Sequence, residues 1–76
     1  MVSVRFFDGD GENGQPIFDV EMIAPPQIGT TVRFDWWNAK DEVYRVTAIE
    51  HKIKVVMVDN KPAATHSFVI VSTQLI

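Results

Sequence analysis

Two stretches of this sequence, residues 55–58 and 68–71, are apolar at every position. Successive side chains of a strand point to opposite faces, so a strand with one face in water should alternate between apolar and polar residues. Uninterrupted apolar strands usually have both faces covered. A chain of 76 residues forms one domain. The sequence therefore predicts more apolar strand surface than the interior of one small fold can bury.

Apolar residues recur with a period of two along most of the chain, which predicts strands and no long helix. A segment rich in turn-forming residues, 8–16, joins the first two strands into a hairpin with a long loop. We expect a bulge near residues 48–50 and a loop at residues 59–65. The expected strands cover residues 2–7, 17–23, 31–37, 43–51, 53–58 and 68–72.

Six short strands in one domain, residues 1–76, predict an all-β fold with little or no helix. The expected architecture is a small antiparallel barrel or a rolled sheet. Closing such a sheet would remove the exposed edges through which open sheets aggregate.

Pro26, Gly29 and Val32 form a P-x-x-G-x-x-V segment, and Tyr44 and Val46 follow in a Y-x-V strand. On these residues the chain resembles SH3-like small β-barrels over residues 25–51. Several small phage and prophage proteins, including head-to-tail connection components, are similar. The resemblance implies an SH3-like barrel and the role of a phage accessory protein, either a connector or an inhibitor of a host protein. It carries over no functional residue.

Charge and composition narrow the class of protein. Seven basic residues stand against ten acidic ones, and residues 1–30 hold five acids and one base. This balance argues against a protein whose main task is to bind phosphate backbones, because such binding needs clustered Lys and Arg. The chain has no cysteine, begins without an apolar leader, and holds no aliphatic run longer than four residues. We expect a cytoplasmic protein (host cytoplasm if phage-encoded) that does not enter a membrane.

No motif in the sequence indicates catalysis or a cofactor. There is no G-x-S-x-G elbow and no glycine-rich phosphate loop, so we predict no enzyme, no catalytic residue and no cofactor. His51 and His66 are the only histidines, and nothing in their spacing predicts that they meet with a carboxylate to form a zinc site. The carboxylates of the first loop echo a calcium loop, but Asn13 occupies the position that requires glycine. We predict no metal site. A calcium-dependent domain is a third hypothesis for the function, after the two described below.

Trp36 and Trp37 are neighbours on a predicted strand, so they point to opposite faces. If Trp36 fills the interior, Trp37 lies outside it, and an exposed tryptophan is a common anchor of protein interfaces. We therefore predict a non-enzymatic interaction module that binds another protein or itself as a homo-oligomer. The expected partner-binding residues are Phe7, Arg33, Trp37 and Arg45.

Two simpler accounts would remove the need for a partner. The first hairpin or the tail at residues 75–76 could cover the outer face, or scattered exposed valines could need no cover. The alternative function is a nucleic-acid-binding barrel, in which bases stack on Trp37 beside Arg33, Lys40 and Arg45. The competing explanation for this cluster of aromatic residues is that Phe34, Trp36 and Tyr44 are core residues.

Overall fold

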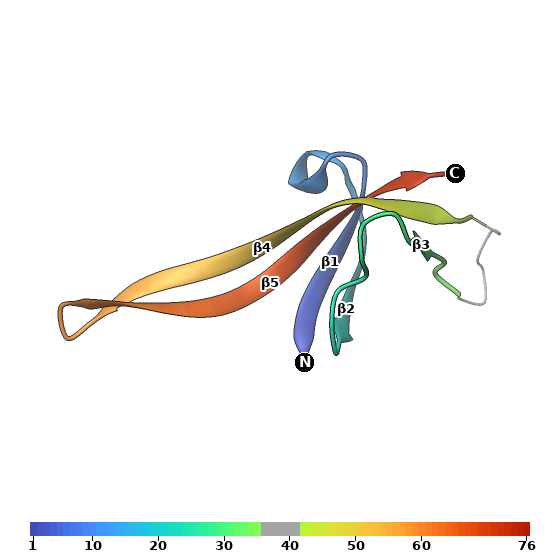
Figure 1. The fold of residues 1–76 in the computed structure, drawn as a ribbon. Coiled ribbons are helices and arrows are strands. Elements are labelled where there is room, and N and C mark those ends of the chain that lie inside the picture. Colours follow the sequence, from blue (N-terminus) through green and yellow to red (C-terminus); the bar gives the residue numbers. More distant parts are fainter. Residues whose placement is uncertain (36–41) are drawn as a thin grey trace.

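The computed structural model describes residues 1–35 and 42–76, and the chain in these ranges is almost entirely β-structure (Figure 1). Apart from one 3₁₀ turn, these ranges contain no helix. The prediction of an all-β fold is confirmed. The elements are β1 (Val2–Asp8), η1 (Gly11–Asn13), β2 (Gln15–Met22), β3 (Thr31–Val32), β4 (Tyr44–Val58) and β5 (Lys61–Leu75).

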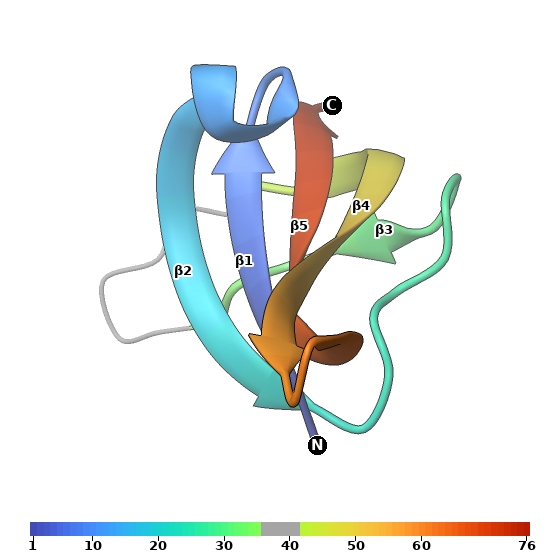
Figure 2. The same cartoon turned by 90° about the vertical axis from the view of Figure 1, so that its left-hand side faces the viewer.

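The strands form a mixed sheet in the order β2-β1-β5-β4-β3. Figure 2 shows the sheet curled around its own concave face, which matches the rolled-sheet form of the prediction. β1 and β2 form the expected hairpin, with Val4 opposite Val20. The structure differs from the expected antiparallel pairing at β1 and β5, which run parallel. These two strands lie at opposite ends of the chain, so their connection is long enough for a parallel crossover.

The second half of the chain forms fewer and longer strands than expected. The predicted strands at 43–51 and 53–58 are one strand, β4, because only Lys52 separates them and no glycine or proline stops the ladder. The expected loop at 59–65 shrinks to a turn at Asp59 and Asn60, and β5 begins at Lys61. The expected third strand is reduced to Thr31–Val32 within the described residues. In the described part of the chain, five strands therefore replace the predicted six.

The β4–β5 hairpin contains two irregularities in its pairing, one on each side of the bulge that we predicted near residues 48–50. The register of β4 on β5 shifts between Val46 and Ala48 and again between Lys52 and Ile53. At the second shift Lys52 pairs with Phe68 and Ile53 with His66, so one residue of β5 stands unpaired. Such bulges increase the local twist of a strand, and this one marks the point where the hairpin leaves the sheet.

The core lies on the concave face, beneath the crossing of β1, β5 and β4. Its fully buried side chains are Val4, Phe6, Val46, Val69 and Val71. Phe34 packs its ring edge-on against Phe6 at a centroid distance of 5.1 Å and contacts the rings of Phe18 and Tyr44. Phe34 is therefore half-buried against the core, as the competing explanation for the aromatic cluster proposed, and the half-buried Tyr44 packs on the ring of Phe34. Trp36 lies outside the described residues.

The convex face of β5 is covered by the loop of the first hairpin. Ile70 and Ser72 point away from the core yet are only 2% and 6% exposed. A Cβ atom on Gly11 would lie 3.5 Å from the Ser72 hydroxyl oxygen, so η1 rests directly on the strand. The first of the two simpler accounts, cover by the first hairpin, is therefore correct for residues 69–71. The covered faces explain the unbroken apolar sequence of this strand.

Candidate functional site: the projecting arm

The outer half of the β4–β5 hairpin extends away from the sheet as a two-stranded ribbon (Figure 1). We call this ribbon, residues 53–66, the arm. β1 pairs with β5 only from Val69 onward and β3 pairs with β4 only at Tyr44 and Arg45. Both edges of the arm are therefore unpaired within the described ranges. A lone two-stranded hairpin is marginally stable in water, so the arm is the part of this fold that gains most from a partner.

The local sequence explains why the arm forms a ribbon. Val55, Val56 and Val58 are β-branched residues that favour extended backbone. Asp59 and Asn60 follow with φ angles of 51° and 61°. Asp and Asn tolerate this left-handed conformation, and a two-residue turn with two positive φ values has the twist that a hairpin requires. Pro62 sits beside the turn on an edge strand, where its missing N–H leaves no gap in a ladder.

The two faces of the arm differ in chemistry. Pairing and alternation place Ile53, Val55 and Met57 on one face, which continues the concave face of the sheet. They are 52%, 60% and 67% exposed. Pro62 and Ala64 pair with Met57 and Val55 on the same side, and we call these five residues the apolar face. The opposite face, the lysine face, holds Lys54, Val56, Val58, Lys61, Ala63 and Thr65.

The arm gives this chain more surface than a compact fold of its size. The molecule measures 51 × 23 × 19 Å, and its radius of gyration is 14.5 Å, against about 11 Å for a compact domain of this length. The accessible surface is 5702 Å², whereas a compact monomer of this mass exposes about 4,700 Å². The difference of roughly 1,000 Å² is comparable to the ~800 Å² that each partner buries in a standard interface.

Two histidines face each other where the arm leaves the sheet. Nδ1 of His51 and Nε2 of His66 are 3.1 Å apart, and both side chains are exposed. One ring must donate and the other accept, so this contact needs at least one neutral imidazole. His51 and His66 were predicted to be ordinary strand-end or loop residues. The long register of β4 on β5 brings them together, and the sequence alone gave no signal of it.

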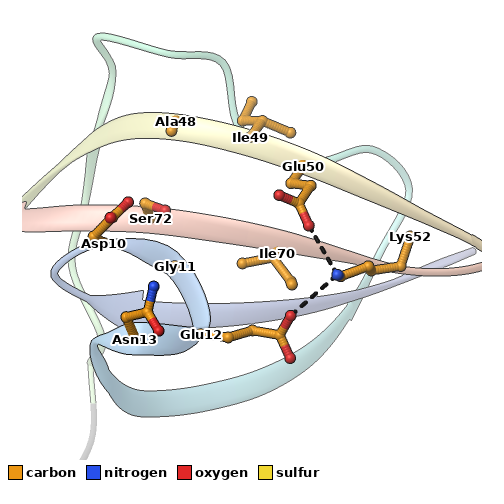
Figure 3. A pocket seen from close by; sticks show the side chains of 10 residues that line it. All are labelled: Asp10, Gly11, Glu12, Asn13, Ala48, Ile49, Glu50, Lys52, Ile70 and Ser72. Carbon is orange, nitrogen blue, oxygen red and sulfur yellow. Dashed lines mark ion pairs between the residues drawn. The ribbon is translucent and has the colours of Figure 1, made fainter.

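A polar pocket of about 450 Å³ lies between η1 and the base of the arm (Figure 3). Lys52 reaches across it and forms ion pairs with Glu50 at 3.0 Å and Glu12 at 3.2 Å. These hydrogen bonds, first that with Glu50 and then that with Glu12, raise the pKa of Lys52 above its usual value. The pair with Glu12 ties the first hairpin to the base of the arm. The pocket is also lined by Asp10, Gly11, Asn13, Ala48, Ile49, Ile70 and Ser72.

Two of the carboxylates that echo a calcium loop, Glu12 in the first loop and Asp19 on β2, lie beside cationic side chains. Glu12 pairs with Lys52, and Asp19 lies 3.9 Å from the Nε of Arg5. Arg5 also stacks over the ring of Phe68 at 4.0 Å. Within residues 1–35 and 42–76, no group of three or more His, Asp or Glu side chains is placed to hold a metal ion.

The structure describes three of the four predicted partner-binding residues, namely Phe7, Arg33 and Arg45. Phe7 is half-buried in β1, opposite Ser72 of β5. Arg45 is exposed opposite Thr31, and the exposed Arg33 follows on the neighbouring segment. Trp37 lies outside the described residues, as does Lys40 of the nucleic-acid alternative. Arg33 and Arg45 thus lie on neighbouring segments at the β3 edge, whereas Phe7 lies on β1, which β5 separates from β4.

Sequence reasoning identified part of the arm and missed its extent. Val55–Val58 was singled out as an apolar strand, and these residues are indeed exposed. Ile53 and the residues of β5 that face it were missed, because Pro62 and the small residues after it indicated a loop. The usable signal was the Asp59-Asn60 pair, which is typical of a tight hairpin turn.

No protein-family model, curated protein or solved structure matches this chain. The resemblance to SH3-like and phage proteins therefore stays a prediction. In the described ranges, no helix is long and apolar enough to cross a bilayer.

Proposed function

We propose that this chain is a non-enzymatic protein-interaction module and that the arm is its binding element. The observation that carries the proposal is the apolar face, where Ile53, Val55 and Met57 are each more than half exposed. Exposed apolar surface of this extent marks interaction sites in soluble proteins. The arm's free edges add a second mode of recognition, since unpaired backbone groups can extend a sheet into a partner.

The proposal moves the binding surface from the region around Trp37 to the arm. Residues 69–71 are covered by the chain itself and offer nothing to a partner. Trp37 stays a predicted anchor, and the expectation for Trp37→Ala is an intact fold with association weakened by ~2 kcal/mol. A phage accessory role and a cytoplasmic location also stay predictions.

The test compares three immobilised proteins: the wild type, Val55→Asp in the arm, and Ile28→Asp as a matched control. Ile28 is 63% exposed in the connector before β3, so both variants place a carboxylate on an exposed aliphatic position. Each is probed with an extract of the source organism and with free wild-type chain. We expect the wild type and Ile28→Asp to retain a protein, and Val55→Asp to lose it. Circular dichroism confirms that both variants fold.

Equal capture by Val55→Asp and the wild type would place the binding surface elsewhere and overturn the proposal. A wild type that retains no protein but binds single-stranded oligonucleotides would favour the nucleic-acid alternative. In that case affinity should fall steeply with salt, because Lys and Arg release counterions from the phosphates.

A further inference from the structure

We propose that the arm's partner is a second copy of this chain, and that the arm of one copy adds to the free edge of β2 in the next. This inference rests on the proposed function and names its partner. β2 is the last strand of the sheet, and no strand of the described ranges pairs with the outer edge of its residues 19–22. The arm offers the complementary free strand edge.

The charges of the two elements are opposite. Residues 51–68, the arm and its base, hold Lys52, Lys54 and Lys61 against one acid, Asp59. β2 holds Asp19 and Glu21 and no base. Two arms placed side by side would bring lysines together, and like charges on directly paired residues are destabilising. The electrostatics therefore favour pairing of the arm with β2 over pairing of the arm with itself.

The two sequences also alternate in the same way. In β2 the order is Asp19, Val20, Glu21, Met22, and Val20 shares the concave face with its pair Val4. From the base of the arm into the arm itself, the order is Lys52, Ile53, Lys54, Val55. Aligning the two segments sets Glu21 beside Lys54 on the convex side and apolar beside apolar on the concave side. Asp19 and Lys52 also lie side by side in this alignment, and each keeps its ion pairs within its own copy.

Val20 and the apolar face would both lose water in this arrangement. Val20 is 38% exposed on β2, and Ile53 and Val55 are more than half exposed on the arm. Burial of such side chains stabilises an interface by ~25 cal/mol per Å² of apolar surface removed from water.

The strand order fixes the direction of the contact. β2 and β4 run the same way in the sheet and expose opposite edges, so a copy added with matched faces pairs its β4 parallel to the neighbour's β2. Each copy then uses its arm once and its β2 edge once. Such a head-to-tail contact builds a ring or an open chain rather than a closed twofold dimer.

The first experiment measures molar mass by light scattering over a concentration series. The proteins are the wild type, Lys54→Glu, Glu21→Lys, the double variant, and Asp10→Lys as a control of equal charge change outside both elements. We expect the wild type to grow beyond a dimer, and each single reversal to weaken association about tenfold. The double variant should recover most of the loss, and Asp10→Lys should match the wild type. If the double variant associates as weakly as the sum of the two single losses predicts, the pairing of the arm with β2 is wrong.

The second experiment mixes Val55→Asp, which has an intact β2 edge, with Glu21→Lys, which has an intact arm. At a concentration where each variant alone is monomeric and the wild type is associated, the mixture should form a 1:1 dimer that grows no further. If Glu21→Lys alone dimerises as well as the wild type, arm pairs with arm and the inference is wrong. A wild type that is monomeric at every concentration also overturns it. In that case capture of a foreign protein by the arm would leave the proposed function standing.

Discussion

The hydroxyl of Thr73 donates a 2.7 Å hydrogen bond to the backbone carbonyl oxygen of Phe7, joining two residues 66 positions apart. Thr73 is 1% exposed, and the bond lies beside the parallel pairing of β1 and β5. It therefore fastens the first strand to the last one. Since the arm is the continuation of β5, this contact also anchors the arm's root.

Removing this hydroxyl should destabilise the fold. Thr73→Val keeps the side-chain shape but leaves the carbonyl of Phe7 without this donor, so we expect a loss of about 1–2 kcal/mol in the free energy of unfolding. Thr47→Val is the matched control, because the Thr47 hydroxyl donates a longer bond of 3.2 Å to Ser72 from an exposed position. Urea denaturation measures both, and equal losses would contradict the assignment.

Valines of the core and of the arm should respond differently to truncation. Val71 is fully buried, so Val71→Ala should cost roughly 2 kcal/mol through lost burial and a residual cavity. Val55 is 60% exposed, so Val55→Ala should change the stability of the monomer by less than about 0.5 kcal/mol. Thermal or chemical unfolding of dilute protein measures the difference. A large loss for Val55→Ala in a confirmed monomer would mean that the arm packs against its own chain.

The turn at the arm's tip depends on a left-handed residue. Asn60 has a φ of 61°, and a β-branched side chain is strained there by about 1–2 kcal/mol. Asn60→Val should therefore speed amide exchange throughout the arm while leaving the core amides protected. Asn60→Gly is the control, since glycine adopts this conformation without strain and should preserve the arm. Unchanged exchange in Asn60→Val would show that the turn does not hold the ribbon.

Tyr44 should titrate above its ordinary pKa of about 10. Its hydroxyl donates to a carboxylate oxygen of Glu42 at 2.9 Å, and this bond, followed by burial, raises the pKa of Tyr44. Tyr44 is the only tyrosine, so phenolate absorbance reports it directly. Glu42→Gln should bring the midpoint back toward the ordinary value. No change in that variant would exclude Glu42 as the main cause.

The same raised pKa fixes the direction of one contribution to stability. The folded state holds the Tyr44 proton more tightly than the unfolded chain does, so the contribution is complete below the unfolded pKa. It is lost as the pH rises through the raised pKa of Tyr44. The raised pKa of Lys52 acts in the same direction. Stability measured by denaturation should therefore decline at alkaline pH, and more steeply in the wild type than in Glu42→Gln.

The sequence by itself determined the all-β class, the first hairpin and the core face of β1, because the alternation of Val2, Val4 and Phe6 is a local pattern. It also identified 55–58 as a strand apolar on both faces. Local patterns have a period of two and carry this information without any tertiary contact.

Only the tertiary structure decided what covers each apolar strand. Residues 55–58 and 68–71 look alike in sequence, yet η1 and the core cover Val69, Ile70 and Val71, while Val55 and Met57 lie exposed on the arm. The difference arises because the parallel pairing places β1 beside the last residues of β5 and leaves the outer half of the hairpin without neighbours. Such long-range pairing depends on which segments meet in space, and the composition of a strand does not specify it.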